Sequence, residues 1–213
     1  MYRPKNRNEL MGLILNCYRG KLYLKDIDTS LIDSMSYIFD SQYYQYKYRE
    51  DDMDINIIWD NPNNVISDWD TSNVTDINSV FYGSKFNQDI SNWNTSNVTD
   101  MRNMFYGSKF NQDISMWDIS SVTDMSWMFA HSEFNQDISE WILSLNPGVN
   151  MGWFNENSKH REIYGGIYDY RDFLKSINWK VLLENSDIKK RYKLLKKLNN
   201  IKSIDGVDLD IRK

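Results

Sequence analysis

The chain has 213 residues and a mass of 25.5 kDa, enough for one ordinary domain or for an elongated repeat body with an appendage. Its net charge of −5 and pI of about 5.1 argue against nucleic-acid or membrane binding by the protein as a whole. A single cysteine, Cys17, excludes an internal disulfide and a multi-cysteine metal site, and its apolar context predicts a buried thiol.

A helix is expected near the N-terminus, where "ELMGLILNCY" holds a short apolar run. Glu9 lies at the start of this stretch and no small-residue cleavage site follows, which argues against a signal peptide. No run approaches the roughly 18 apolar residues of a membrane span. We therefore expect an intracellular protein, in the host cytoplasm if a phage or virus encodes it.

Residues 1–66 are predicted to form an N-terminal cap with a degenerate first repeat and an insertion. The stretch Ile27–Phe39 matches Trp69–Phe81 at an offset of 42, and the extra residues run roughly from Asp40 to Ile57. This insertion is rich in tyrosine, a residue that gives large contact area at low entropy cost. It is either a surface loop or edge hairpin over the first coil, or a partner-contact loop that uses Tyr43, Tyr44 and Tyr46.

Residues 67–154 contain the strongest signal, a repeat with a period of 24. It is marked by Trp69, Trp93, Trp117 and Trp141, and residues 69–92 agree with 93–116 at 18 of 24 positions. Such a period is typical of solenoids, in which each unit buries its apolar face against its neighbours. The fold class we expect is an α/β solenoid with an N-terminal helical cap and a helical C-terminal appendage.

Two patterns alternate within each unit. In "SNVTDMRNMFYG" the apolar residues Val98, Met101, Met104 and Phe105 share one helical face, which predicts a helical turn or two. Gly107, and His131 in the third copy, are expected to take a left-handed backbone conformation after it. The segment "FNQDISNW" predicts a brief strand that pairs in parallel with its copies.

Three kinds of residue recur in columns. The Trp column is expected to form the core, and the Asn column (Asn87, Asn111, Asn135) to satisfy backbone groups in a turn. Two Asp columns (Asp76, Asp100, Asp124; Asp89, Asp113, Asp137) suggest either caps of turns or calcium ligands. Each unit has a single glycine, which disfavours stacked calcium-binding loops, so no metal site is predicted.

Positions that vary between copies are expected to face solvent and to carry recognition. The candidate partner-binding residues among them are Tyr82, Arg102, Tyr106, Met116 and Trp127. Helical geometry points Trp127 outward, and aromatic and Met side chains are enriched at contact sites. The alternative is that Trp127 packs beneath the C-terminal appendage.

Residues 155–213 are predicted to form a helical appendage that covers the open end around Trp141, Trp153 and Phe154. One face of its last helix is basic, with Lys189, Lys190, Lys193, Lys196 and Lys197. This face is either solvated or a contact for nucleic acid or an acidic partner. No aromatic residue interleaves the lysines, which disfavours a site that stacks single-stranded bases.

Catalysis finds little support in the sequence. The two histidines, His131 and His160, are far apart in the chain, and there is no phosphate loop, nucleophile elbow or cluster with metal-ligand spacing. We therefore expect no catalytic residues and no cofactor.

The stretch "SNVTDMRNMFYGSKFNQDIS" and the "DIDTS" at Asp26–Ser30 resemble the BspA-like bacterial surface protein repeat of about 25 residues, over residues 1–153. The resemblance implies a right-handed, leucine-rich-repeat-like solenoid that serves protein binding or adhesion, without catalytic residues. Many members are secreted or lipid-anchored, whereas no signal peptide or lipobox cysteine is recognised here.

The function expected from the sequence is therefore non-enzymatic protein–protein interaction with a protein partner. Two alternatives are a phage- or virus-encoded inhibitor that binds a host defence enzyme, and a protein that binds nucleic acid through the basic C-terminal helix.

Overall fold

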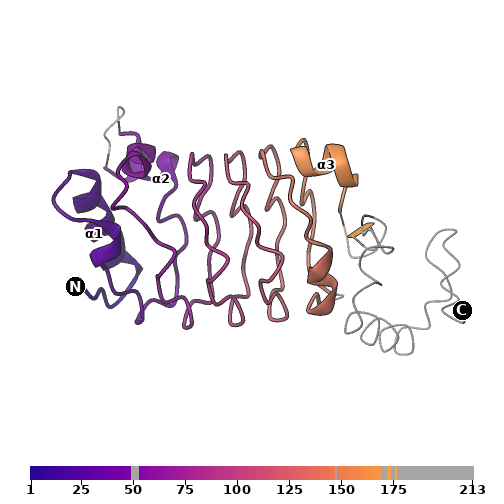
Figure 1. Cartoon of the computed structure of the whole chain (residues 1–213), viewed down its shortest axis with the longest axis horizontal. Coiled ribbons are helices and arrows are strands. Elements are labelled where there is room, and N and C mark those ends of the chain that lie inside the picture. Colours follow the sequence, from indigo (N-terminus) through magenta and orange to yellow (C-terminus); the bar gives the residue numbers. More distant parts are fainter. Residues whose placement is uncertain (49–52, 147, 169–171, 174–175, 177–213) are drawn as a thin grey trace, which may run out of the picture.

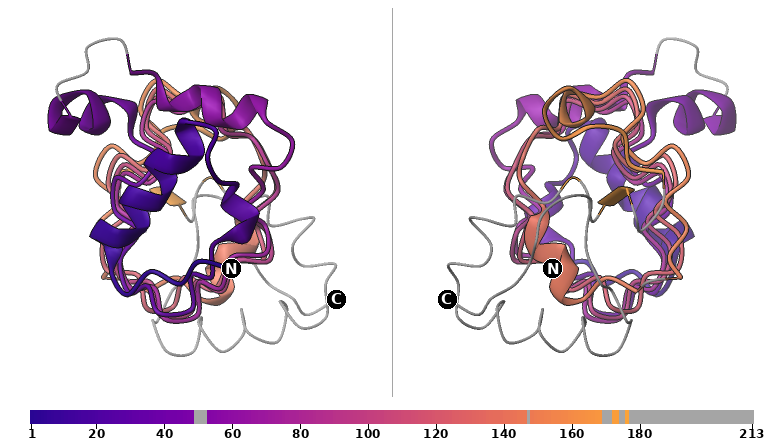
Figure 2. Two further views of the ribbon diagram at one scale, coloured as in Figure 1. Left: turned by 90° about the vertical axis from the view of Figure 1, so that its left-hand side faces the viewer. Right: turned by 90° about the vertical axis from the view of Figure 1, so that its right-hand side faces the viewer.

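The computed structural model describes residues 1–48, 53–146, 148–168, 172–173 and 176. Its named helices are α1 (Arg7–Tyr18), α2 (Ser41–Tyr48) and α3 (Lys159–Tyr164), with 3-10 helices η1 (Leu24–Asp26), η2 (Ile55–Asp60) and η3 (Ser139–Leu143). Between α1 and α3 the chain winds into a row of similar coils (Figure 1). End-on views show the coils in register behind one another, with α2 outside their outline (Figure 2).

The predicted fold class, an α/β solenoid of the leucine-rich-repeat type, is wrong. In the described residues the coils contain neither a named strand nor a sheet, and the segments predicted to be helical in each unit are turns. Neighbouring coils are joined by isolated parallel bridges at one position, Ser34–Asp76–Asp100–Asp124–Asn150. The protein is thus a stack of mostly irregular coils.

Backbone hydrogen bonds between coils explain why no helix forms in these turns. Alternate N–H groups donate to the next coil, as from Ile77 to the Asp100 carbonyl (3.0 Å) and from Phe81 to the Met104 carbonyl (2.9 Å). An α-helix requires every N–H to bond four residues back within its own segment. Because half of the donors reach another coil, the apolar spacing that looked helical produces a buried turn.

Left-handed residues also break the helical path twice in each repeat. In the third full copy they are Trp127 (φ 60°) and His131 (φ 57°), and in the second Asn103 (54°) and Gly107 (62°). The left-handed conformation predicted for Gly107 and His131 is confirmed. A non-glycine residue rarely adopts this conformation, so its recurrence every 24 residues is a fixed feature of the coil.

Asparagine amides provide the hydrogen bonds where a strand was predicted. The backbone N–H of Asn111 donates to Oδ1 of Asn87 (2.8 Å), and that of Asn135 donates to Oδ1 of Asn111 (2.9 Å). The amide ladder predicted for this column is confirmed. It links the coils through side chains instead of a backbone ladder.

The core is a set of aromatic columns that run along the stack. Trp93 and Trp117 are each 3% exposed, and their indole Nε1–H groups donate to the carbonyls of Ile66 (3.0 Å) and Ile90 (3.1 Å) one coil earlier. Two columns of stacked phenylalanine rings pack beside them, Phe81–Phe105–Phe129 and Phe86–Phe110–Phe134. The prediction that the recurrent Trp residues form the core is confirmed.

α1 covers the first coil. Asn6 caps it by accepting a hydrogen bond from the Glu9 N–H (3.0 Å), and Leu10, Met11 and Ile14 on its inner face are fully buried. Cys17 is buried on the same helix, as predicted, and burial raises the pKa of its thiol to about 12. In the described residues, no helix is both long and apolar enough to cross a membrane.

The last coil replaces two core phenylalanines with a polar pair. It follows the preceding coil at an offset of 26, so that Asn155 stands in the place of Phe129 and His160 in that of Phe134. Nδ2 of Asn155 lies 3.0 Å from Nδ1 of His160, and the His160 ring stacks on Phe134 at 5.9 Å. The repeat pattern therefore reaches His160.

Residues after this coil cover its outer side. Ile167 and Phe173 are buried, as are Trp141 and Phe154 at the end of the stack. The expected cover by a helical appendage stays a prediction, because most of residues 155–213 lie outside the described ranges. The basic last helix predicted for this appendage lies outside the described residues.

The buried imidazole of His160 predicts acid sensitivity. Burial lowers its pKa from 6.5 to about 4, opposed in part by the negative charge of Asp137. The unfolded chain then binds a proton that the folded chain does not, so the free energy of unfolding should fall as pH drops from 6.5 to 4, by up to about 3 kcal/mol. Urea unfolding at several pH values measures this loss.

The matched control is His160→Phe, which restores the phenylalanine of the preceding coil and cannot titrate. It should flatten the slope between pH 6.5 and 4 and leave acid unfolding below pH 4, where carboxylates titrate, unchanged. An equal slope in both proteins would assign the sensitivity to another group.

Candidate functional site

Five aromatic side chains, Tyr82, Tyr106, Trp127, Trp153 and Tyr168, form a continuous surface row that we call the aromatic ledge. Tyr82 and Tyr106 stack at 4.8 Å with ring planes 4° apart, and Tyr106 contacts Trp127 at 6.2 Å. Trp127 and Trp153 stack at 5.3 Å, and Tyr168 closes the row edge-on to Trp153 at 5.7 Å. Trp153 is 50% exposed and Tyr168 38%.

The two tryptophans of the ledge sit on left-handed backbone. They share one column with Ser79 (φ 55°) and Asn103 (54°), while Trp127 has φ 60° and Trp153 φ 58°. Asn tolerates this conformation well, whereas a bulky side chain there is a genuine outlier. The first coil has Tyr37 (φ 61°) at the same position, so aromatic residues occupy this column in the first coil and in the last two, with Ser79 and Asn103 between them.

Hydrogen bonding separates the ledge tryptophans from the core tryptophans. The indole N–H groups of Trp69, Trp93, Trp117 and Trp141 each donate to a buried backbone carbonyl. Within the part of the chain that the structure describes, those of Trp127 and Trp153 have no acceptor. Because indole is a donor only, these edges can donate to a molecule at the surface.

Glu156 and Arg161 fix the end of the ledge. Arg161 donates to the Glu156 carboxylate and to the Tyr168 hydroxyl, which itself donates to Oε2 of Glu156 (2.8 Å). The guanidinium also lies 5.3 Å from the Tyr168 ring centre, and its hydrogen bond with this tyrosine raises the pKa of Arg161. These contacts hold Tyr168 against Trp153.

A column of half-buried carboxylates, Asp76, Asp100 and Asp124, lies three residues before the left-handed column that contains Trp127. Arg102 binds Asp100, with Nε 3.0 Å from both carboxylate oxygens and Nη2 2.6 Å from Oδ2. This charge-assisted pair raises the pKa of Arg102. The predicted contact residue Arg102 is therefore exposed but already paired within its own coil.

Hydrogen bonds also explain the other carboxylates of this column. Asp76 and Asp124 accept the backbone N–H groups of Asn78 (2.9 Å) and Ser126 (2.8 Å), which is the turn-capping role. No group of three or more His, Cys, Asp or Glu side chains is arranged to hold a metal ion in the residues that the structure describes.

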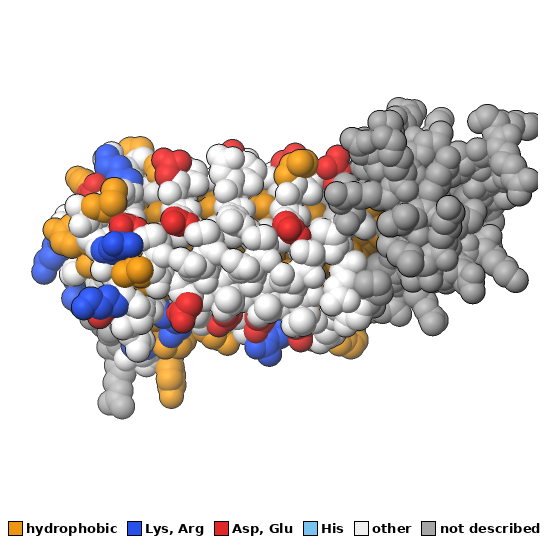
Figure 3. Space-filling view, turned by 90° about the horizontal axis from the view of Figure 1, so that it is seen from below, with side chains coloured by type: hydrophobic (Ala, Val, Ile, Leu, Met, Phe, Trp, Pro, Cys, Tyr) orange, Lys and Arg blue, Asp and Glu red, His pale blue; other side chains and the backbone are white. Residues whose placement is uncertain are grey.

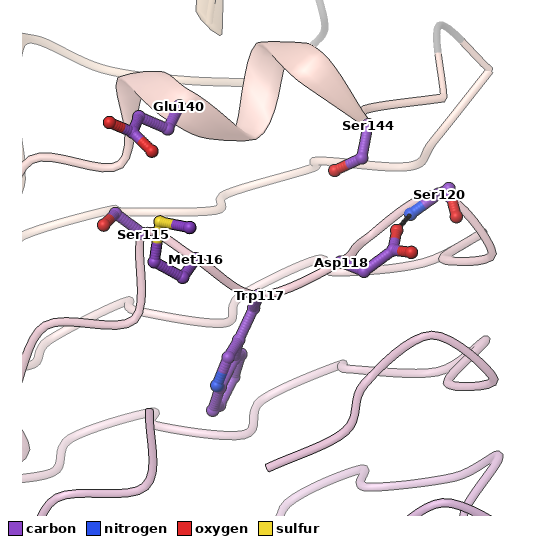
Figure 4. A pocket seen from close by; sticks show the side chains of 7 residues that line it. All are labelled: Ser115, Met116, Trp117, Asp118, Ser120, Glu140 and Ser144. Carbon is purple, nitrogen blue, oxygen red and sulfur yellow. Dashed lines mark hydrogen bonds between the residues drawn. The ribbon is translucent and has the colours of Figure 1, made fainter. Parts of the chain in front are cut away.

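Met116 belongs to a different surface. It is 75% exposed beside an open hollow of ≈ 410 Å³ whose lining includes none of the ledge residues. Figure 4 shows Glu140 and Met116 at one end of the hollow and Asp118, Ser120 and Ser144 at the other. The structure therefore does not unite Met116 with Trp127, with which the sequence grouped it.

The tyrosines of the insertion have different environments, and α2 replaces the loop or hairpin expected for them. Tyr44 is fully buried, so it contributes to the core instead of a contact surface. Tyr43 stacks on Tyr37 at 5.4 Å, with the Arg7 guanidinium 5.2 Å from its ring centre. Tyr46 is 86% exposed and is the one of the three that is open to a partner.

The remaining surface is largely uncharged where the molecule is seen from below (Figure 3). Exposed threonines and asparagines bond the preceding coil, as Thr99 does to the Thr75 carbonyl (3.1 Å) and Asn97 to the Ser72 carbonyl (2.7 Å). The candidate contacts Lys189, Lys190, Lys193, Lys196 and Lys197 lie outside the described residues.

Sequence reasoning missed four residues of the ledge and its support: Trp153, Glu156, Arg161 and Tyr168. A signal existed for the first, because "SWMF" at 126–129 and "GWF" at 152–154 place a tryptophan at matching positions. The last coil follows at an offset of 26 where the full copies before it follow at 24, which hides this match when the copies are aligned every 24 residues.

A protein-family model described as "Mycoplasma protein of unknown function, DUF285" matches residues 52–163, more than half of the chain. No curated protein and no solved structure matches it significantly.

Proposed function

The chain belongs to the family described as Mycoplasma protein of unknown function, DUF285, and we propose that it is a non-enzymatic protein-binding module whose contact surface is the aromatic ledge. The observation that carries the proposal is the left-handed backbone of Trp127 and Trp153 (φ 60° and 58°). Strained residues persist where the surrounding structure or a function requires them. Ser79 and Asn103 show that a small residue suits this backbone position, and the aromatic residue of the first coil, Tyr37, is stacked on Tyr43, whereas Trp153 is 50% exposed.

The composition of the ledge supports a protein partner. Trp, Tyr and Arg are the residues most enriched at binding hot spots, and here they are held by stacking and by the Glu156–Arg161 pair. A surface that is ordered before binding loses less side-chain entropy when a partner arrives.

Ring orientation favours a protein over a sugar or a polyproline segment. Tyr82 and Tyr106 lie 4.8 Å apart and parallel, and Trp127 and Trp153 stack at 5.3 Å, so the ring faces cover one another. Sugar rings stack on open aromatic faces, and polyproline segments dock into aromatic-lined grooves. The edges that remain suit hydrogen-bond acceptors and the flat contacts of a protein surface.

The environments of the two histidines support the non-enzymatic part of the proposal. His160 is buried and paired with Asn155, and His131 is exposed beside the Tyr106 ring at 5.2 Å. In the described residues, neither imidazole is hydrogen-bonded to a Ser, Thr, Tyr or Cys side chain that it could activate as a nucleophile. The finer likeness to BspA-like surface repeats, which serve protein binding or adhesion, belongs to the same proposal.

Replacing Trp127 and Trp153 together with Asn should abolish partner capture and leave the fold intact. Asn relieves the left-handed strain, of order 1–3 kcal/mol per residue, while the loss of stacking costs about 1 kcal/mol. The free energy of unfolding should therefore change little or rise. Urea unfolding and affinity capture from a host lysate are measured on the same preparations.

Met116→Ser is the matched control, since it removes an exposed apolar side chain from another surface. It should capture the same proteins as the wild type. If the double Asn variant still captures the same proteins, the ledge is not the contact surface. If the variant unfolds at a much lower urea concentration than the wild type, the two tryptophans belong to the core.

A further inference from the structure

We infer that the segment bound at the aromatic ledge is basic, and that it places an Arg or Lys side chain on Asp124 beside Trp127. This inference rests on the proposed function, because it specifies the partner of the same surface. It goes further in assigning the charge of that partner and the carboxylate that receives it.

The repeat itself contains an example of such binding. In the second full copy Arg102 lies two residues after Asp100 and grips its carboxylate through Nε and Nη2 at 2.6–3.0 Å. This shows that a carboxylate of the column, in its ordinary place in the coil, accepts a guanidinium side-on.

The neighbouring copies have the carboxylate without the cation. The residues that correspond to Arg102 are Asn78 and Ser126, and no Lys or Arg in the described ranges forms an ion pair with Asp76 or Asp124. Asp124 accepts two hydrogen bonds, from the Ser126 N–H (2.8 Å) and from Nδ2 of Asn150 (2.9 Å). A carboxylate has about four acceptor sites, so it can take a further donor.

Position within the coil favours Asp124 over Asp76. Asp124 shares its turn with Trp127, whereas the turn of Asp76 carries Ser79 in the same place. A cation on Asp124 therefore brings its peptide to the indole edges of Trp127 and Trp153, which have donors but no acceptor in the described part of the chain. The carbonyls of that peptide are the matching acceptors.

The charge of the body agrees with a basic partner. Residues 1–176 contain 15 Lys and Arg against 25 Asp and Glu, a net charge of −10, and residues 177–213 contain 10 against 5. An acidic body attracts a basic segment from a distance, and a local carboxylate then fixes its register.

The test uses the full chain and a hexa-arginine peptide, with hexa-glutamate as the charge-reversed probe. The indole N–H signals of the eight tryptophans are followed by ¹⁵N NMR and assigned with single Trp variants. Hexa-arginine should move the signals of Trp127 and Trp153 and leave those of Trp93 and Trp117 in place. Affinity should fall as salt is added, and hexa-glutamate should move none of them.

Three variants locate the cation. Asp124→Asn should weaken hexa-arginine binding about fivefold or more, while Asp113→Asn, which removes the same charge from another column, should change it less than twofold. Ser126→Arg copies the arrangement of Arg102 one coil later, so its own guanidinium should occupy Asp124 and weaken binding as much as Asp124→Asn does.

The inference is overturned if Asp124→Asn and Asp113→Asn weaken hexa-arginine binding equally, or if the peptide leaves the Trp127 and Trp153 signals in place. Any binding that remains would then reflect only attraction by net charge. The proposed function can be judged separately through partner capture. If Trp127→Asn/Trp153→Asn abolishes capture while Asp124→Asn and Ser126→Arg retain it, the ledge remains the contact surface and the basic partner is rejected. If the double Asn variant retains capture, the proposed function itself fails.

Discussion

Trp117→Ala is expected to lower the free energy of unfolding by about 3–5 kcal/mol. The side chain is 3% exposed and packs against Phe105, so its removal opens a cavity in the middle of the stack. It also leaves the Ile90 carbonyl, which now accepts the indole N–H at 3.1 Å, without that partner. Urea unfolding followed by circular dichroism measures the loss.

Trp117→Phe separates the two contributions, because it keeps an aromatic ring and removes the N–H. We expect it to cost about half as much as Ala. Met116→Ser, one residue away and exposed, should change stability by less than about 0.5 kcal/mol. A Trp117→Ala protein that unfolds at the wild-type urea concentration would refute the role of this column in the core.

The sequence predicts the core of this protein better than its secondary structure. Val98, Met101, Met104 and Phe105 were assigned to one buried face, and all four are buried. The predicted helix is absent. Apolar residues spaced three and four apart also fit a turn in which backbone N–H groups bond alternately within their own coil and to the next coil. Only the acceptors of the backbone N–H groups distinguish such a turn from a helix, and in the turn half of these acceptors lie a full repeat away in the sequence.

The candidate site was predictable to a similar extent. Variation between copies identified Tyr82, Tyr106 and Trp127, which the structure places in one row. Trp153 escaped because the offset of 26 at the last coil shifts it out of the 24-residue register. The left-handed backbone of Trp127 could not be read from its neighbours, since Ser79 and Asn103 fit many other conformations.

The last coil yields the second large prediction, for Asn155, which is fully buried. Its Nδ2 donates to the Gly165 carbonyl (2.8 Å) and lies 3.0 Å from Nδ1 of His160, while its Oδ1 accepts the Ile167 N–H (2.9 Å). Asn155→Ala leaves two buried groups without this partner, the Ile167 N–H and Nδ1 of His160, each worth about 1–3 kcal/mol when unsatisfied, and also removes the part-buried bond to the Gly165 carbonyl. We expect a loss of roughly 3 kcal/mol or more in the free energy of unfolding.

Two comparisons show whether this loss comes from the cover of the stack. Asn92→Ala, at an exposed asparagine for which the structure shows no hydrogen bond within its described residues, should leave stability unchanged. Amide hydrogen exchange should speed up for Ile167 in Asn155→Ala and stay slow for Met101 in the middle of the stack, because the Ile167 N–H loses its acceptor. Slow exchange at Ile167 together with unchanged urea unfolding would mean that the cover is held by apolar contacts alone, and that the polar pair which replaces Phe129 and Phe134 does not stabilise the end.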